Sequence, residues 1–124
     1  MKKFPILVGL ATVLIIIIGV LILSRGNSGN ALSLPNNYEF FYSSTCPHCK
    51  NVEDFLNSWD KKDKVKIDKF EVGTNSANAT NMLKRSTYCK LPNDQIGAVP
   101  FLFTPDGKCL VGDEPIINFF QNLK

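Results

Sequence analysis

The stretch Thr45-Cys46-Pro47-His48-Cys49-Lys50 decides how the rest of the chain is interpreted. It follows an apolar, β-prone run at residues 38–42 and precedes an amphipathic helical pattern at residues 52–59. Two cysteines three positions apart at the start of a helix can close a small disulfide ring with little backbone movement. The first sulfur then faces solvent and the second lies behind it, which is the arrangement that dithiol–disulfide exchange requires.

Composition and charge exclude one large class of function. The chain has 124 residues, four cysteines and a net charge of +3. Lys2, Lys3 and Arg25 account for that charge, because the residues after Arg25 carry equal numbers of basic and acidic side chains. A nucleic-acid-binding domain normally presents a basic face, so we expect no nucleic-acid partner. The even number of cysteines is compatible with an oxidising compartment.

The N-terminal region contains an apolar run, residues 6–23, rich in Ile, Leu and Val. The run is about long enough to cross a hydrocarbon core of ~30 Å, and it exceeds the ~7–15-residue apolar core of a signal peptide. We therefore predict an uncleaved transmembrane anchor over residues 1–25, with a cleaved signal peptide as the alternative. Lys2 and Lys3 predict a cytoplasmic N-terminus, so that the protein is a single-pass protein of the cell membrane with its remainder outside the cytoplasm.

The remainder is predicted to be a flexible linker followed by one α/β domain. Residues 26–37 are rich in Gly, Asn and Ser, which indicates the linker. Over residues 38–124 the periodicity predicts the order β-α-β-α-β-β-α, a mixed central sheet flanked by helices. The strands are expected at residues 38–42, 65–72, 100–104 and 109–111, and the helices at about 46–59, 76–88 and 113–123. The alternation of the second strand changes face midway, which suggests a bulge.

Several side chains are given a position by these patterns. Asp113 is expected to cap the last helix. Leu83 is expected on the inward face of the preceding helix, together with Ala79, Met82 and Ser86. Glu39 is interpreted as an exposed or edge glutamate, because acidic side chains are rarely buried; the alternative is a buried acid beneath the cysteine pair.

Cys46 is the predicted nucleophile, because the free N–H groups and partial positive charge of a helix N-terminus stabilise a thiolate. Cys49 is the predicted resolving thiol, Pro47 presets the first helical turn, and His48 is expected to contribute positive charge or a hydrogen bond to the Cys46 thiolate. The alternative for the cysteine pair is half of a zinc site. No second Cys-x-x-Cys accompanies it, so we expect no metal.

The remaining cysteines, Cys89 and Cys109, have three interpretations. They could form a structural disulfide that closes a loop around Val99-Pro100. They could be two separate buried thiols that fill space in the core. They could also relay electrons to the Cys46/Cys49 pair.

These residues resemble the thioredoxin superfamily over residues 38–124. The resemblance rests on the strand–Cys46-Pro47-His48-Cys49–helix unit, on Val99-Pro100 at the start of a later strand, and on the final hairpin and helix. The Pro-His pair is similar to that of DsbA-like oxidases, whereas the short domain and Val111-Gly112-Asp113-Glu114 are more similar to glutaredoxins. The resemblance implies a cis peptide bond at Pro100, beside the active-site disulfide, and a substrate-binding groove lined by Val99 and Pro100.

The resemblance also implies a function, a membrane-tethered thiol–disulfide oxidoreductase that acts on protein thiols through Cys46 and Cys49. It would need no cofactor beyond its own redox-active disulfide. We expect a monomer that exchanges electrons with a membrane partner. Whether it oxidises or isomerises its substrates, or reduces them, is left open. Two alternatives remain, a glutathione-dependent glutaredoxin-like reductase and a non-catalytic adaptor whose disulfide is structural.

Overall fold

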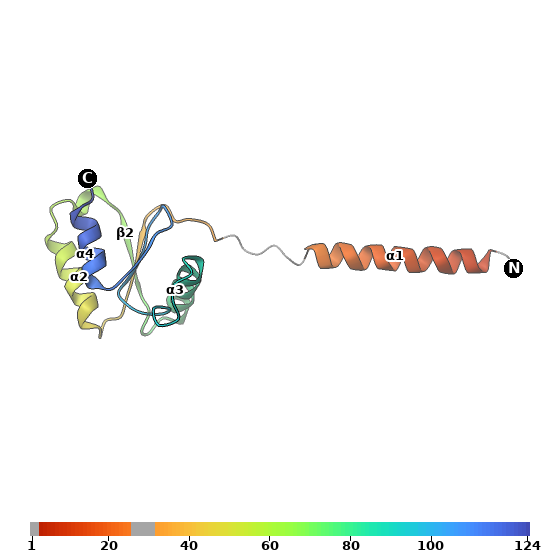
Figure 1. Cartoon of the computed structure of the whole chain (residues 1–124), viewed down its shortest axis with the longest axis horizontal. Coiled ribbons are helices and arrows are strands. Elements are labelled where there is room, and N and C mark those ends of the chain that lie inside the picture. Colours follow the sequence, from red (N-terminus) through yellow and green to blue (C-terminus); the bar gives the residue numbers. More distant parts are fainter. Residues whose placement is uncertain (1–2, 26–31) are drawn as a thin grey trace. The chain divides into compact units, whose positions relative to one another are not determined.

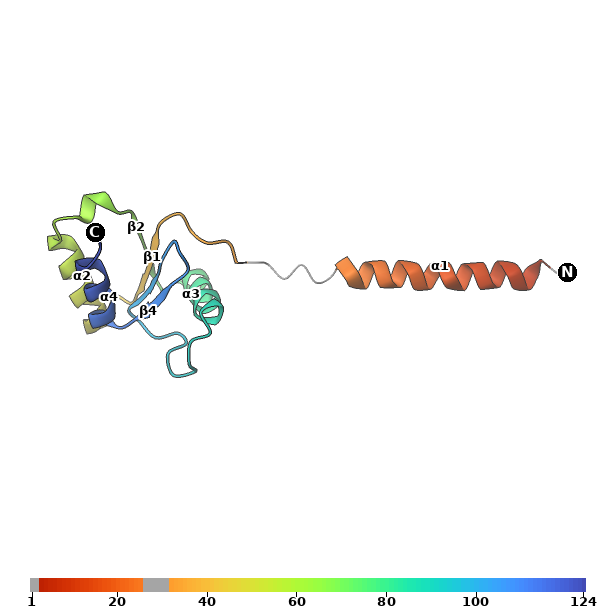
Figure 2. The same cartoon turned by 45° about the horizontal axis from the view of Figure 1, so that its top comes forward.

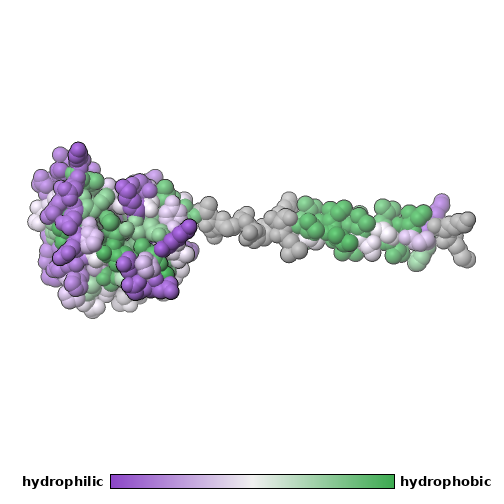
Figure 3. Space-filling model, viewed as in Figure 1, coloured by the Kyte–Doolittle hydropathy of each residue, from purple (hydrophilic) through white to green (hydrophobic). Residues whose placement is uncertain are grey.

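The computed structural model describes residues 3–25 and 32–124, which belong to two separate units of the chain. In the first unit, α1 (Phe4–Arg25) is a single helix. It is long and apolar enough to cross a membrane, with a mean hydropathy of 3.0 over Phe4–Ile22 and no part of that window buried. Figure 3 shows the apolar surface that this helix presents. The predicted apolar helix is therefore confirmed.

The second unit, residues 32–124, is a mixed α/β domain. Its elements follow the predicted order, with one 3-10 turn (η1) added after the first helix of the domain. They are β1 (Tyr38–Tyr42), α2 (Pro47–Ser58), η1 (Lys62–Lys64), β2 (Ile67–Glu71), α3 (Ser76–Tyr88), β3 (Phe101–Phe103), β4 (Cys109–Val111) and α4 (Asp113–Gln121).

The strands form one four-stranded mixed sheet in the order β2-β1-β3-β4. β1 pairs in parallel with β2, with Tyr38 opposite Ile67, and in antiparallel fashion with β3, with Phe40 opposite Leu102. β3 and β4 form the antiparallel hairpin. β1 is thus a central strand, paired on both sides.

Helices cover both faces of the sheet (Figures 1 and 2): α2 and α4 lie side by side on one face and α3 lies on the other. Because successive strand residues point to opposite faces, β1 contributes to two separate cores. Phe40 packs with Val52, Leu56 and other residues of α2 and α4. Phe41 packs on the α3 side, with Met82 among others.

The bulge suggested for the second strand is wrong. The register between β1 and β2 runs without interruption from Tyr38–Ile67 to Tyr42–Glu71. Val65 and Ile67 pack on the α2/α4 face, and Phe70 and Val72 pack on the α3 face. The change in alternation therefore reflects a strand that is covered on both faces, as strands in parallel pairs commonly are.

The prediction that Leu83 lies on the inward face of α3 is also wrong. Leu83 is 43% exposed, whereas Arg85 and Ser86 are buried with Met82. Met82 and Ser86 of the expected face are buried, and Arg85 joins them because it has a buried partner in the sheet, described below.

The predicted linker of residues 26–37 falls on two parts of the chain. Residues 26–31 lie outside the described residues. From residue 32 onward the chain contacts the domain: Leu32 packs against the core on the α3 side, Ser33 accepts a hydrogen bond from Arg85, and Asn37 donates one to Asp68. These contacts assign residues 32–37 to the folded unit.

Candidate functional site

Cys46 occupies the N-cap position of α2, immediately after the short turn that leaves β1. Its backbone is extended, with φ −92° and ψ 116°, and its sulfur accepts a hydrogen bond from the backbone N–H of Cys49 at 3.3 Å. Pro47 stands in the first turn, where a missing N–H costs nothing. The Cys46 sulfur thus lies at the end of the helix where unpaired N–H groups favour negative charge.

Cys49 lies one helical turn further and is fully buried, whereas Cys46 is partly exposed. Burial, followed by the hydrogen bond with the Cys46 side chain, raises the pKa of the Cys49 thiol to about 12. A thiol with such a pKa stays protonated near neutral pH. Of the two cysteines, Cys46 is therefore the one that an external sulfur can reach, and Cys49 is the one held behind it.

Val99 and Pro100 bring a second segment to the same sulfur. The Val99–Pro100 peptide bond is cis, as the resemblance implied. Cys46 Sγ lies 3.9 Å from the carbonyl oxygen of Val99, within reach of a weak S–H···O hydrogen bond. The carbonyl of Pro100 in turn accepts a hydrogen bond from the N–H of Gly112 at 2.9 Å, which joins this segment to the start of α4.

His48 interacts with α4 rather than with the cysteine sulfurs. Its Nδ1 lies 3.0 Å from Asp113 Oδ2, and the side-chain amide of Asn51 donates to the same oxygen at 2.8 Å. These bonds from Asn51, and secondarily from His48, lower the pKa of Asp113 to about 2. Within the described residues, His48 makes no hydrogen bond to Cys46, so the direct contact with the thiolate expected from the sequence is not formed in this structure.

The capping role predicted for Asp113 is wrong. Gly112, with φ 96°, is the N-cap residue of α4, and no side chain caps the helix. Asp113 stands in the first turn, where its carboxylate points to α2 and binds His48 and Asn51. Sequence patterns of capping are local, whereas these partners lie more than 60 residues earlier in the chain.

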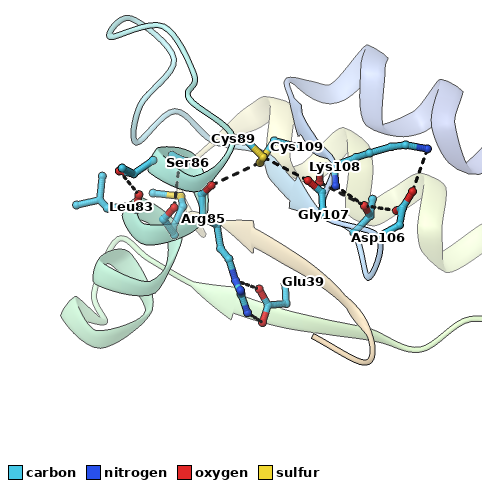
Figure 4. The surroundings of a disulfide bond; sticks show 12 residues. Glu39, Leu83, Arg85, Ser86, Cys89, Asp106, Gly107, Lys108 and Cys109 are labelled. Carbon is cyan, nitrogen blue, oxygen red and sulfur yellow. Dashed lines mark hydrogen bonds and ion pairs between the residues drawn. A yellow bond between two sulfur atoms is a disulfide. The ribbon is translucent and has the colours of Figure 1, made fainter. Parts of the chain in front are cut away.

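Glu39 is buried, so its interpretation as an exposed or edge residue is wrong. Only 9% of its side chain is exposed, and it pairs with Arg85, whose Nε and Nη2 donate to its two carboxylate oxygens at 2.7 and 2.9 Å. Figure 4 shows the Arg85 side chain directed at Glu39. Because Phe40 next to it faces α2, Glu39 faces α3. The buried acid is therefore not beneath the Cys46/Cys49 pair.

Cys89 and Cys109 form a disulfide, as the first of their interpretations predicted, and are therefore not two separate thiols. Cys89 follows the last residue of α3 and Cys109 opens β4, so the bond closes a loop that contains Val99 and Pro100. Figure 4 shows the disulfide beside the backbone of Arg85, whose carbonyl oxygen lies 3.6 Å from Cys109 Sγ. The disulfide thus joins the two ends of the loop that brings Val99 to Cys46.

Residues 3–25 and 32–124 contain no cluster of three or more His, Cys, Asp or Glu side chains that could hold a metal ion. The sequence pointed to Cys46, Cys49, Val99 and Pro100, and the structure brings these segments together. Asp113 and Asn51 were missed as members of the site, because nothing near them in the sequence marks them.

In comparisons with known proteins, no protein-family model matches the chain and no curated protein matches it significantly.

Proposed function

We propose that the protein is a membrane-tethered thiol–disulfide oxidoreductase with a thioredoxin-like domain. The observation that carries the proposal is the pairing of a partly exposed Cys46 at a helix N-cap with a fully buried Cys49 one turn later. The cis Val99–Pro100 bond, whose carbonyl lies 3.9 Å from the Cys46 sulfur, supports it. A purely structural disulfide would need neither the exposed sulfur nor the helix terminus.

The reaction passes two electrons between protein thiols and the cysteine pair. When Cys46 and Cys49 are joined in a disulfide, a substrate thiolate attacks Cys46 Sγ. The new sulfur–sulfur bond forms as the Cys46–Cys49 bond breaks, and Cys49 leaves with the electron pair and takes up a proton. A second substrate thiolate then attacks the substrate sulfur of the mixed disulfide and releases Cys46 as a thiolate. The substrate is oxidised, the protein is reduced, and the same steps in reverse make the protein a reductase.

Cys49 lies behind Cys46, in the position of the thiol that would displace a substrate from the mixed disulfide. In the reduced pair its pKa is raised to about 12, so it holds its proton at neutral pH. Because only a thiolate attacks a disulfide, Cys49 must lose this proton before it can act as the resolving thiol.

The proposed location is outside the cytoplasm, with α1 as a single-pass anchor in the cell membrane. Lys2 and Lys3 precede the apolar segment, which favours a cytoplasmic N-terminus. The Cys89–Cys109 disulfide supports the same side, because such bonds persist mainly in oxidising compartments.

A glutaredoxin-like use of glutathione has less support. A cradle for the glutathione tripeptide would draw on Lys50 and the Gly112-Asp113 turn. Lys50 is paired with Asp54, and Asp113 Oδ2 already accepts hydrogen bonds from His48 and Asn51. The adaptor alternative has no need of an exposed Cys46. We therefore propose protein thiols and disulfides as the substrates, with a membrane partner to reoxidise or re-reduce the pair.

The test is a redox titration of the full-length protein in detergent micelles. After equilibration in graded thiol–disulfide buffers and acid quenching, free thiols are alkylated and counted by mass. A Cys46–Cys49 couple at roughly −120 to −180 mV identifies an oxidase or isomerase, and one near roughly −270 mV identifies a reductase. The Cys46→Ser variant is the matched control and should form no mixed disulfide with a thiol peptide, whereas Cys49→Ser should accumulate one. A Cys46–Cys49 reduction potential below about −300 mV is typical of a structural disulfide. That result would refute the proposal and favour the adaptor.

A further inference from the structure

The contact between His48 and Asp113 fixes which nitrogen of the imidazole ring carries a proton. With a pKa of about 2, Asp113 is ionised at neutral pH, and an ionised carboxylate can only accept hydrogen bonds. Nδ1 of His48, 3.0 Å from Asp113 Oδ2, must therefore be the donor. In the neutral ring, Nε2 is then the nitrogen with the free lone pair.

The His48 ring is largely exposed at the N-terminal end of α2. The His48 side chain is 70% exposed, while that of Asp113 is only 20% exposed. Within residues 3–25 and 32–124, the ring makes its hydrogen bond to Asp113 alone. On α2 the neighbouring Lys50 is 3.0 Å from Asp54, and on α4 Glu114 is exposed beside Asp113. Asp113 is thus the charged group that bonds the ring.

The ring cannot serve Cys46 well from this position. Its Nδ1 is bonded to Asp113 of α4, and within the described residues it makes no hydrogen bond to Cys46. The His48 ring is 70% exposed and the partly exposed Cys46 lies two residues before it, so we take the incoming substrate thiol as the proton donor for the ring. Near neutral pH most thiols are protonated and only the thiolate attacks a disulfide.

We propose that Asp113 is a positioning residue that orients His48 so that its Nε2 accepts the proton of the substrate thiol as that thiol attacks Cys46. This inference rests on the proposed function and names a general base for it. The thiol proton passes to Nε2 and then to water, the thiolate sulfur bonds to Cys46 Sγ, and Cys49 leaves with the electron pair of the broken disulfide. In the reverse direction the protonated ring returns a proton to the departing substrate thiolate.

The proposal predicts a distinctive dependence on pH. Asp113→Asn removes the charge and lets the side chain offer either an oxygen or an N–H group, so the tautomer is no longer fixed. We expect the rate with a thiol peptide to fall about tenfold near pH 7, less than for the buried Asp of a serine-protease triad. Above the peptide's thiol pKa of about 8.5 the difference should vanish, because the substrate is then already a thiolate.

The experiment uses the full-length protein in micelles in its Cys46–Cys49 disulfide form. Stopped-flow rates of thiol-peptide oxidation are measured from pH 6 to 10, and the ¹⁵N resonances of His48 report the tautomer without ambiguity, because the chain has one histidine. Asp54→Asn is the matched control. It removes an exposed carboxylate on the same helix that pairs with Lys50, and it should change neither the rate nor the tautomer.

The outcomes separate the inference from the function on which it rests. A wild-type ring protonated at Nε2 would overturn the inference, as would an Asp113→Asn rate that equals the wild-type rate or falls by the same factor at every pH. Exchange that is absent in every variant, with the Nδ1–H tautomer present in the wild type, would refute the proposed function and with it the role of His48 as a base. A rate defect confined to low pH, together with loss of the fixed tautomer, supports the inference.

Discussion

Replacing Glu39 by Gln should destabilise the domain strongly, because the change leaves the Arg85 guanidinium buried without a counter-charge. The two side chains are 9% and 7% exposed, and both carboxylate oxygens accept bonds from Arg85. After the substitution, the Ser33 carbonyl and one amide oxygen remain as acceptors. Removing one partner of a buried ion pair typically lowers the free energy of unfolding by about 3–5 kcal/mol. We expect a loss of about 3 kcal/mol here, because Gln keeps the shape of Glu and one acceptor oxygen.

The double variant Glu39→Leu/Arg85→Met separates charge from packing. It removes both charged groups and fills the space with apolar side chains. Replacing a buried ion pair in this way is often neutral or stabilising, so we expect a free energy of unfolding within about 1 kcal/mol of the wild type. The stacking of the Arg85 guanidinium over the Phe103 ring, 4.5 Å from its centroid, is lost in this variant and accounts for a small part of any deficit.

The assay is a urea titration of the fragment 32–124, followed by the fluorescence of Trp59. The chain has one tryptophan, and it is 7% exposed in the core between α2 and α4. With a urea dependence of about 2 kcal/mol per molar for a small domain, the Glu39→Gln midpoint should fall by roughly 1.5 M. A midpoint unchanged in Glu39→Gln, or a double variant as unstable as the single one, would refute the assignment of the loss to an unpaired buried charge.

Three further predictions concern the cysteines and Asp113. Replacing Cys89 and Cys109 by Ser should lower the free energy of unfolding by about 3 kcal/mol, because their bond closes a loop with a sequence separation of 20; an equal urea midpoint with and without the bond would contradict this. Iodoacetamide at pH 8 should label Cys46 of the reduced protein and spare Cys49, which is buried and has a pKa of about 12; equal labelling in a mass spectrum taken over time would contradict this. Because the pKa of Asp113 is lowered to about 2, its contribution to stability should be present above the ordinary aspartate pKa of about 3.9 and lost as the pH falls towards 2; Asp113→Asn should therefore lose stability at pH 5 but not at pH 2, and a constant difference between these pH values would contradict this.

The elements that could be predicted from the sequence are those specified by local patterns. The aromatic run at 38–42 and the amphipathic helix after Cys46 follow from periodicity and from Pro47 in the first turn. The hairpin around Pro105-Asp106-Gly107 follows from its turn residues, with φ 82° at Gly107. Cys46 and Cys49 were recognisable for the same reason, since spacing and helix position are both local properties.

The features that could not be predicted depend on contacts between distant parts of the chain. Glu39 and Arg85 are 46 residues apart, and nothing near Glu39 indicates that a cation will be buried beside it. Asp113 has a sequence typical of a helix cap, but its oxygen is bound by His48, 65 residues earlier. The Cys89–Cys109 bond was one of three interpretations, because pairing depends on where α3 ends relative to β4 in space.

The bond from Arg85 to the Ser33 carbonyl has a mechanical consequence for the membrane-tethered protein that we propose. The chain enters the domain through residues 32–37 and continues directly into β1, which is bonded to β2 on one side and to β3 on the other. A force on the N-terminal end therefore meets the Arg85–Ser33 bond first and then the two ladders of β1. The same arginine forms an ion pair with Glu39 of β1, so it links residue 33 to the sheet. Tension is therefore borne by the middle of the sheet before it reaches the turn that holds Cys46.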